Sequence, residues 1–293
     1  MPKFVEESHN AKNMRKGFLA HAPVSTKAYF FILSFIAGYM ASSLIGSAIA
    51  AAASGYAATK AVQTIHTALL FAMPAWATHY AIYDSPLKKT MRMRKPSGTD
   101  IIICMAVTVT IIPFTSMLAD ISRAITFPEF MSGVAERIKE ADAQQASNLT
   151  LSLGNNDAMH MACNILLMGV FTAICEEIFF RGTMQELLCQ STGAIWAVTI
   201  TAFVFSGIHM EYSGFLSRMS LGWIIGYAFI ISRNICIPIT MHAFNNILAI
   251  ILMQNGMNST ESMGKGTALL SGAAGLAVTA YLMHAWRKRK DKD

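Results

Sequence analysis

The sequence predicts an all-α polytopic integral membrane protein, a bundle of about eight transmembrane helices with its N- and C-termini in the cytoplasm (N-in, C-in). Of the 293 residues, 54% are hydrophobic and only 14% are charged, and the mean hydropathy is +0.43. A soluble domain typically carries about 25% charged residues. The charges are also clustered, which leaves long apolar stretches of about the 20 residues that a bilayer-spanning helix requires.

Eight apolar segments follow one another along the chain, and we expect each of them to form a membrane-spanning helix. The first ends in the Ala- and Gly-rich run 47–58, and such small residues favour close helix packing. The second contains Pro74, which predicts a kink that a bundle tolerates. The eight expected spans are 28–53, 61–83, 100–119, 158–181, 194–210, 217–232, 235–253 and 267–286.

The chain is expected to form one membrane domain, because no internal repeat and no soluble domain is visible in the sequence. Residues 1–27 are interpreted as a cytoplasmic N-terminal tail and residues 28–286 as a single transmembrane domain. Its motif-bearing core spans 157–252, and 287–293 form a basic cytoplasmic tail.

The orientation follows from three basic regions, which eight spans would place on one side of the membrane. The positive-inside rule makes that side cytoplasmic. The longest loop, 120–157, has three basic and six acidic residues and is expected on the opposite side. Its stretch 128–141 predicts a short amphipathic helix at the interface, either a connector or a gate for substrate. The basic residues are Lys3, Lys12, Arg15, Lys16 and Lys27, then Lys88, Lys89, Arg92, Arg94 and Lys95, then Arg287, Lys288, Arg289, Lys290 and Lys292.

Several function classes are disfavoured by the charge and the cysteines. The net charge of +6 comes from short runs beside apolar segments, so no nucleic-acid partner is expected. The five cysteines contain no CxxC pair, so neither a disulfide framework nor a zinc-finger pattern is indicated.

A pair of carboxylates and an arginine stand out in the fourth apolar segment, where ionisable groups indicate a functional site. Glu177 and Arg181 are four residues apart and can pair on one helix face. Glu176 points about 100° away from Glu177 on a helix, toward the bundle interior, where it could serve as a general base. A salt-bridge cluster at a helix end is an equally plausible interpretation of this motif alone.

Two further motifs follow in the fifth and seventh segments, each with a spacing of four residues. Phe205 is expected to pack its ring on the face that carries His209. His242 and Asn246 place an imidazole and an amide on one face, and both can donate hydrogen bonds to an oxyanion. Taken alone, a hydrogen-bonding pair between helices is the simpler interpretation of these two residues.

The ordered combination EExxxR, FxxxH and HxxxN on separate apolar helices resembles the CPBP family of intramembrane proteases. This family includes the CAAX-processing endopeptidases of the Rce1 type and the bacterial Abi proteins. The resemblance covers residues 157–252, and it implies a bundle of about eight helices and hydrolysis of a peptide bond at or within the membrane. The N-terminal half is similar only in having spans.

The resemblance also implies roles for individual residues. Glu176 and His209 would activate the attacking water, and His242 and Asn246 would stabilise the oxyanion. Glu177 and Arg181, with Phe205 beside His209, would support the site or orient the substrate. The cofactor stays open. Glu176, His209 and His242 could bind a divalent metal such as zinc, while a glutamate protease without metal accounts better for the asparagine.

The depth of Glu176 and His209 in the membrane poses a problem. If the fourth span ended at Arg181, Glu176 would lie near one face of the membrane, and the fifth span would carry His209 to the opposite face. We therefore expect the fourth helix to be long and tilted and to continue through Leu188. A bend at Ser206-Gly207 in the fifth helix would also bring the two residues together.

The expected partners are the lipid bilayer and a membrane-associated peptide or protein substrate, which is lipidated if the substrate resembles that of the eukaryotic relatives. The compact chain favours a bacterial inner (cytoplasmic) membrane. Two alternatives stay open. One is a non-proteolytic scaffold or bacteriocin-immunity protein that retains the motif residues. The other is a transporter with a proton relay, although the sequence has no inverted repeats.

Overall fold

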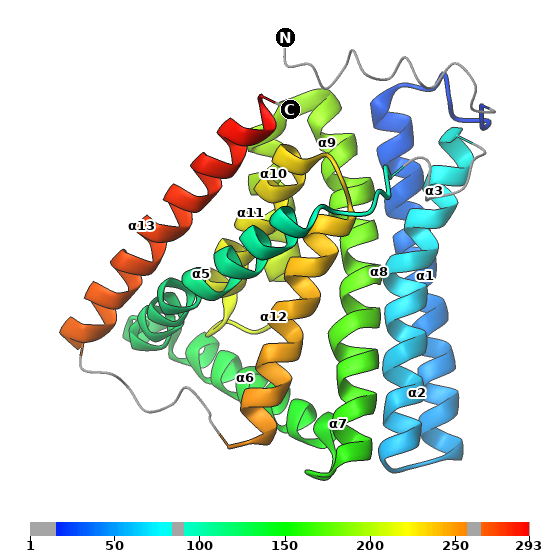
Figure 1. The fold of residues 1–293 in the computed structure, drawn as a ribbon. Coiled ribbons are helices and arrows are strands. Elements are labelled where there is room, and N and C mark those ends of the chain that lie inside the picture. Colours follow the sequence, from blue (N-terminus) through cyan, green and yellow to red (C-terminus); the bar gives the residue numbers. More distant parts are fainter. Residues whose placement is uncertain (1–15, 84–90, 257–264, 293) are drawn as a thin grey trace.

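The computed structural model describes residues 16–83, 91–256 and 265–292, and these residues form helices and connecting turns without a β-strand (Figure 1). The helices fall into the order expected from the apolar segments. They are α1 (Val24–Ala52), α2 (Tyr56–Thr67), η2 (Ala68–Ala72), α3 (Met73–Tyr83), α5 (Gly98–Ala124), η3 (Glu129–Met131), α6 (Ser132–Leu153), α7 (Ala158–Asn164), η4 (Ile165–Phe171), α8 (Thr172–Phe179), η5 (Phe180–Gln185), α9 (Glu186–Thr192), α10 (Ala194–Gly207), α11 (Phe215–Ser232), α12 (Cys236–Gln254) and α13 (Lys265–Lys290).

Six helices in the described part of the chain are long and apolar enough to cross a membrane. Each of the eight expected spans coincides with a helix, but α10 is shorter than a full span, and the helix formed by α2, η2 and α3 is not among the six. The all-helical fold is therefore confirmed, whereas the count of eight spans stays a prediction. The six helices are Val24–Ala52, Gly98–Ala124, Ala158–Thr192, Phe215–Ser232, Cys236–Gln254 and Gly266–Lys290.

The fourth expected span is part of one helix of 35 residues, Ala158–Thr192, as the sequence predicted from its continuation through Leu188. At about 1.5 Å per residue this helix is roughly 50 Å long. It consists of α7, α8 and α9, joined by the π-helical turns η4 and η5, which lie on either side of α8. In Figure 1 it runs the full height of the bundle.

The fifth helix, α10, is shorter than the expected span 194–210. It begins after Gly193, whose φ of +83° suits glycine and lets the chain reverse direction after α9. It ends at Gly207, and the Ser206 hydroxyl donates a hydrogen bond of 2.6 Å to the carbonyl of Phe215 at the start of α11. The chain therefore turns immediately before His209 rather than after it.

The helix α6 replaces most of the long loop between the third and fourth expected spans. The expected amphipathic helix is present, and with its 22 residues it is longer than the 128–141 stretch indicated. Its side chains at 135, 138, 142, 145 and 149 are partly covered and recur every three or four residues, while most of the others are exposed. Figure 1 shows α6 crossing the end of the bundle where α7 begins.

The described residues of the three basic regions lie at the other end of the bundle (Figure 1). The N-terminal segment lies beside the end of α3, because the backbone N–H of Leu19 donates to the Ala81 carbonyl (2.8 Å). At the start of α5, Asp100 accepts hydrogen bonds from Trp286, Arg289 and Lys290 at the end of α13 (2.9–3.0 Å). These contacts are consistent with three basic regions on one side, and which side is cytoplasmic stays a prediction. Lys3, Lys12, Arg15, Lys88 and Lys89 lie outside the described residues.

Helix packing around α8 relies on aromatic rings and on small residues. Phe179 and Phe180 contact Phe31, Phe71 and Phe205 with ring centroids 4.6–5.8 Å apart. In lipid such helix contacts depend on van der Waals packing, because the acyl chains are as apolar as the side chains.

The closest approach of α1 to its neighbour lies away from the Ala- and Gly-rich run. A Cβ atom added at Gly38 would lie 2.1 Å from the carbonyl oxygen of Leu69. The run 47–58 is mostly exposed within the chain, so the expectation that its small residues favour close helix packing stays a prediction. Several of its small side chains line a cavity.

Candidate active site

The second glutamate of the EExxxR motif forms the centre of a fully buried polar cluster. Oε1 of Glu177 accepts a hydrogen bond of 2.6 Å from Nη1 of Arg181, which confirms the expected pair. The same oxygen lies 2.6 Å from Nδ1 of His242, so it also accepts the proton of that imidazole. Nη2 of Arg181 donates to the carbonyl of Gly222 on α11 at 2.9 Å. The cluster thus links α8, α11 and α12 and fixes the ring of His242.

Glu176 lies on another face of α8, as the helical spacing predicted. Its side chain is 8% exposed and lines a cavity of about 870 Å³ together with His209. The wall of this cavity also includes Thr172 of α8 and Gln145 and Asn148 of α6. Small residues from the end of α1 and the start of α2, such as Ala53 and Ala58, complete one side. Glu176 therefore faces the cavity, whereas Glu177 is bonded to Arg181 and His242.

His209 lies just after α10, with its ring against Phe205. The ring centroids are 5.0 Å apart, which confirms the predicted contact. Nδ1 of His209 is 2.7 Å from the carbonyl oxygen of Phe205. A carbonyl oxygen only accepts, so Nδ1 carries the proton and Nε2 of the neutral ring keeps a lone pair. A lone pair at Nε2 is what a base that receives a proton from water requires.

The long fourth helix and the short fifth helix bring Glu176 and His209 to similar depths. Glu176 precedes the end of α9 at Thr192 by 16 residues, which is about 24 Å at 1.5 Å per residue. The 14 residues of α10 carry the chain back by about 21 Å before His209. Because the fourth helix continues to Thr192, Glu176 and His209 do not lie on opposite sides of the membrane domain.

His242 lies between the two glutamates. Its Nδ1 atom is occupied by Glu177, and its Nε2 atom is 3.7 Å from Oε2 of Glu176. This second distance exceeds that of a hydrogen bond. The ring of Phe205 stacks edge-on against His242 with centroids 5.7 Å apart, so one phenylalanine contacts both histidines.

Asn246 lies one turn further along α12 and does not line the cavity that Glu176 lines. Its Nδ2 atom donates to the Met168 carbonyl at 3.3 Å, and its side chain lines a second cavity of about 510 Å³. The two cavities share five lining residues, Gln63, Gln145, Asn148, Thr172 and His209. His209 is the predicted site residue common to both, Glu176 lines the first and Asn246 the second, whereas His242 lines neither of the two cavities.

Whether the site could hold a metal ion depends on whether enough ligand side chains converge. No group of three His, Cys, Asp or Glu side chains that could hold a metal ion occurs within residues 16–83, 91–256 and 265–292. The candidate set of Glu176, His209 and His242 is therefore not assembled as a three-ligand site, and no step below involves a metal.

Polar residues of α6 and the 208–214 turn also belong to the site, and the sequence analysis did not single them out. Gln145 lines both cavities, and Arg218 and Glu211 form an ion pair of 2.7 Å beside Asn246 in the second one. The amphipathic pattern of α6 was a usable signal for Gln145. The Glu211–Arg218 pair has no such signal, because a spacing of seven residues across a turn predicts no contact.

Comparison with known proteins supports the family resemblance. Residues 158–248 match the family model described as "Type II CAAX prenyl endopeptidase Rce1-like". No curated protein and no solved structure matches the chain significantly. The match contains all three motifs and covers about a third of the chain. Together with the apolar helices it identifies a multi-pass integral membrane protein whose motif-bearing segment is Rce1-like.

Proposed function

We propose that this protein is an intramembrane endopeptidase that hydrolyses a peptide bond with a water molecule activated by Glu176 and His209. The observation that carries this proposal is that both side chains line one cavity, although Glu176 lies on α8 and His209 in the turn after α10. The Rce1-like match of residues 158–248 supports the reaction class.

The chemistry begins with a water molecule in the cavity between the two residues. Glu176 and Nε2 of His209 accept hydrogen bonds from it, and its oxygen attacks the carbonyl carbon of the scissile bond. The carboxylate of Glu176 takes the proton of the water. The C–N bond then breaks, and the departing amine receives that proton.

The tetrahedral oxyanion needs donors that are in place before the reaction. Asn246 offers its amide from α12. His242 already donates its Nδ1 proton to Glu177, so its Nε2 atom can donate to the oxyanion when the ring is in the imidazolium form. Glu177 and Arg181 act through His242 by fixing the position of its ring. Mutagenesis of one donor in such a site typically costs about 10²–10³ in kcat.

We also propose that the substrate is a membrane-associated peptide or protein, lipidated or not, and that the protein lies in a bacterial inner membrane. The cavity is suited to a peptide, since it combines small side chains at the end of α1 with polar side chains from α2 and α6.

The test uses purified protein in proteoliposomes with a panel of membrane-anchored and prenylated reporter peptides, analysed by mass spectrometry. Wild type, Glu176→Gln and the control Glu129→Gln, which changes an exposed carboxylate outside the site, are compared. We expect cleavage by wild type and by the control and none by Glu176→Gln.

Two results would contradict the proposal in different ways. Cleavage that persists in Glu176→Gln removes this residue from the mechanism. A physiological function that is retained by Glu176→Gln at normal protein level would favour the scaffold or immunity alternative instead.

A further inference from the structure

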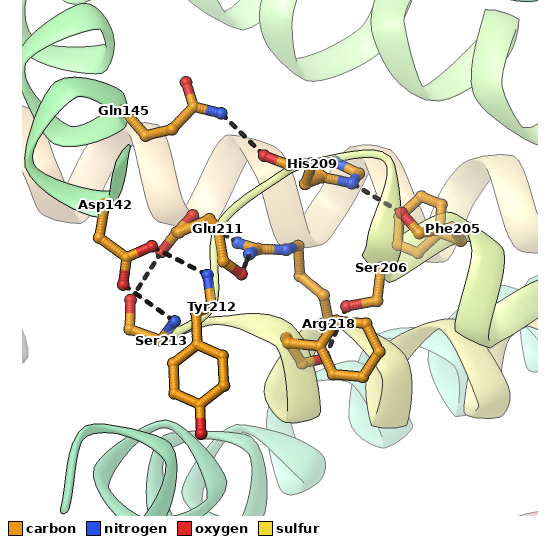
Figure 2. A network of polar contacts seen from close by, with 10 residues as sticks. Asp142, Gln145, Phe205, Ser206, His209, Glu211, Tyr212, Ser213 and Arg218 are labelled. Atoms are coloured by element: carbon orange, nitrogen blue, oxygen red, sulfur yellow. Dashed lines mark hydrogen bonds and ion pairs between the residues drawn. The ribbon is translucent and has the colours of Figure 1, made fainter. Parts of the chain in front are cut away.

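The turn that carries His209 is held by helix α6, which lies outside the segment matched by the Rce1-like family model. Figure 2 shows Asp142 and Gln145 pointing from α6 toward this turn. Oδ1 of Asp142 accepts a hydrogen bond from the backbone N–H of Tyr212 (2.9 Å), and Oδ2 accepts one from that of Ser213 (3.1 Å). Nε2 of Gln145 donates to the carbonyl oxygen of His209 itself (2.8 Å).

These three bonds involve backbone groups that regular secondary structure leaves unpaired. The chain between α10 and α11 forms turns, so the N–H groups of Tyr212 and Ser213 have no partner in a helix. A carboxylate that receives two consecutive N–H groups makes charge-assisted bonds, which are stronger than neutral ones. Asp142 therefore substitutes for the missing secondary structure.

The backbone directly after His209 requires such support. Met210 has a φ of +52°, in the left-handed region that a residue with a side chain seldom adopts. Strained conformations of this kind persist only when the surrounding structure imposes them. The side chain of Met210 is 76% exposed, so packing of that side chain does not impose the conformation. The conformation is instead held by the backbone bond from Met210 N–H to the Gly207 carbonyl (3.1 Å) and by the bonds from α6 on both sides of Met210, to His209 and to Tyr212.

The rest of the turn is held from α10 and α11. The backbone N–H groups of His209 and Met210 donate to the carbonyls of Ser206 (3.3 Å) and Gly207 (3.1 Å). Arg218 of α11 binds the carboxylate (2.7 Å) and the carbonyl (2.9 Å) of Glu211, and Figure 2 shows its guanidinium group directed at Glu211. On the near side, the ring of His209 is tied to Phe205. The peptide group between these two anchors is the one that Gln145 holds.

We propose that Asp142 and Gln145 are positioning residues that hold the backbone of the 208–214 turn so that the Nε2 atom of His209 faces the cavity shared with Glu176. This inference rests on the proposed function for the catalytic role of His209. The attachment of the turn to α6 is a separate property that can be measured without substrate. Gln145 also lines the cavity, whereas Asp142 does not, so Asp142 reports on positioning alone.

The experiment compares wild type, Asp142→Ala, Asp142→Asn and Gln145→Ala in nanodiscs, with Glu140→Ala as the matched control. Glu140 is an acidic residue on the exposed face of the same helix. Hydrogen exchange of the 205–216 segment measures how firmly the turn is held. Ring ¹⁵N spectra, with His209 identified by its loss in His209→Gln, measure whether its Nδ1 proton is retained. The reporter peptide gives kcat and KM separately.

We expect exchange in the turn to rise about tenfold in Asp142→Ala, because two amides lose their acceptor. Misplacement of a reacting group by about 1 Å can cost 10²-fold in rate, so kcat should fall about 10- to 100-fold while KM changes little. Asp142→Asn retains one acceptor and should be intermediate, and Glu140→Ala should match wild type in all three measurements.

Two results would overturn the proposal. The first is that hydrogen exchange in the turn and the ¹⁵N signal of the His209 ring are the same as in wild type in both Asp142→Ala and Gln145→Ala. The other is a loosened turn with an unchanged kcat. If no variant and no wild-type protein cleaves any reporter, the proposed function fails, and the exchange and ring signals alone decide whether α6 holds His209.

Discussion

At the scale of single residues, the arginine of the EExxxR motif has a structural role that can be separated from catalysis. Arg181 and Glu177 have no solvent-exposed side-chain surface. Removal of one partner from a buried ion pair leaves the other charge unpaired and typically costs 3–5 kcal/mol. We expect Arg181→Ala to lower the free energy of unfolding by about that amount in detergent, measured by chemical denaturation.

The control for this prediction is an exposed pair in the same protein. Arg123 and Asp120 lie 2.6 Å apart, with side chains 50% and 42% exposed. Exposed pairs of this kind contribute about 0–1 kcal/mol, so Arg123→Ala should leave stability almost unchanged. Equal effects of the two substitutions would contradict the structural role of Arg181.

Glu177 is expected to influence the reaction through His242 rather than directly. Glu177→Gln keeps the size of the side chain but removes the negative charge that both Arg181 and His242 contact. Loss of the group that orients a catalytic histidine lowers kcat by about 10²-fold or more in comparable sites. Steady-state kinetics should show this loss in kcat with a nearly constant KM. A change confined to KM would instead indicate that Glu177 contacts substrate.

At the scale of elements, the packing of α1 against η2 depends on a single glycine. A side chain at Gly38 would lie against the backbone carbonyl of Leu69, which has no room to move within its helix. Overpacking of this kind typically costs 1–3 kcal/mol, so Gly38→Ala should lower the thermal midpoint of the purified protein. Gly46→Ala is the control, because its Cβ would meet only a side-chain methyl of Val62 at 3.3 Å. A midpoint that falls equally in both variants would contradict this account.

The contact between α5 and α13 is fixed at one end by a buried carboxylate. Asp100 accepts the indole N–H of Trp286, which is 1% exposed. A buried donor left without an acceptor costs about 1–3 kcal/mol, so Asp100→Ala should destabilise the protein by that order. Asp291→Ala, which alters an exposed pair with Arg287 at 3.9 Å, should have little effect in the same unfolding assay. Comparable losses in the two variants would argue against a role of Asp100 in holding the two helices together.

The elements and the site differ in how far the sequence determines them. Hydropathy and helical spacing predicted the helices, the pairing of Glu177 with Arg181 and the contact of Phe205 with His209, because these depend on residues close together in the chain. The spacing of His242 and Asn246 predicted a shared role. That role stays a proposal, and the sequence did not predict their different contacts: the packing of α12 against α8 brings His242 to Glu177 and Asn246 to the Met168 carbonyl. Such packing joins distant segments of the chain, and no local pattern encodes it.

At the scale of the whole molecule, the orientation in the membrane is open to a direct test. The basic residues at one end of the bundle predict that this end is cytoplasmic. In a cysteine-free background, Phe130→Cys on η3, where Phe130 is 86% exposed, should react with a membrane-impermeant maleimide in intact cells. Lys292→Cys should react only after permeabilisation. The reverse pattern would mean that the protein is inserted the other way round.

The two π-helical turns on either side of α8 set the angular phase of the paired glutamates. A π-helical turn accommodates one more residue than an α-helical turn, so it works as a one-residue insertion in the helix. One residue of an α-helix corresponds to about 100° of rotation. Removal of one residue from η4 would thus rotate α8 by roughly that angle relative to α7, and removal of one from η5 would rotate it by the same amount relative to α9. The difference between a glutamate that faces the cavity and one that pairs with arginine is the same angle, so helix phase, as much as residue identity, decides which carboxylate meets the water.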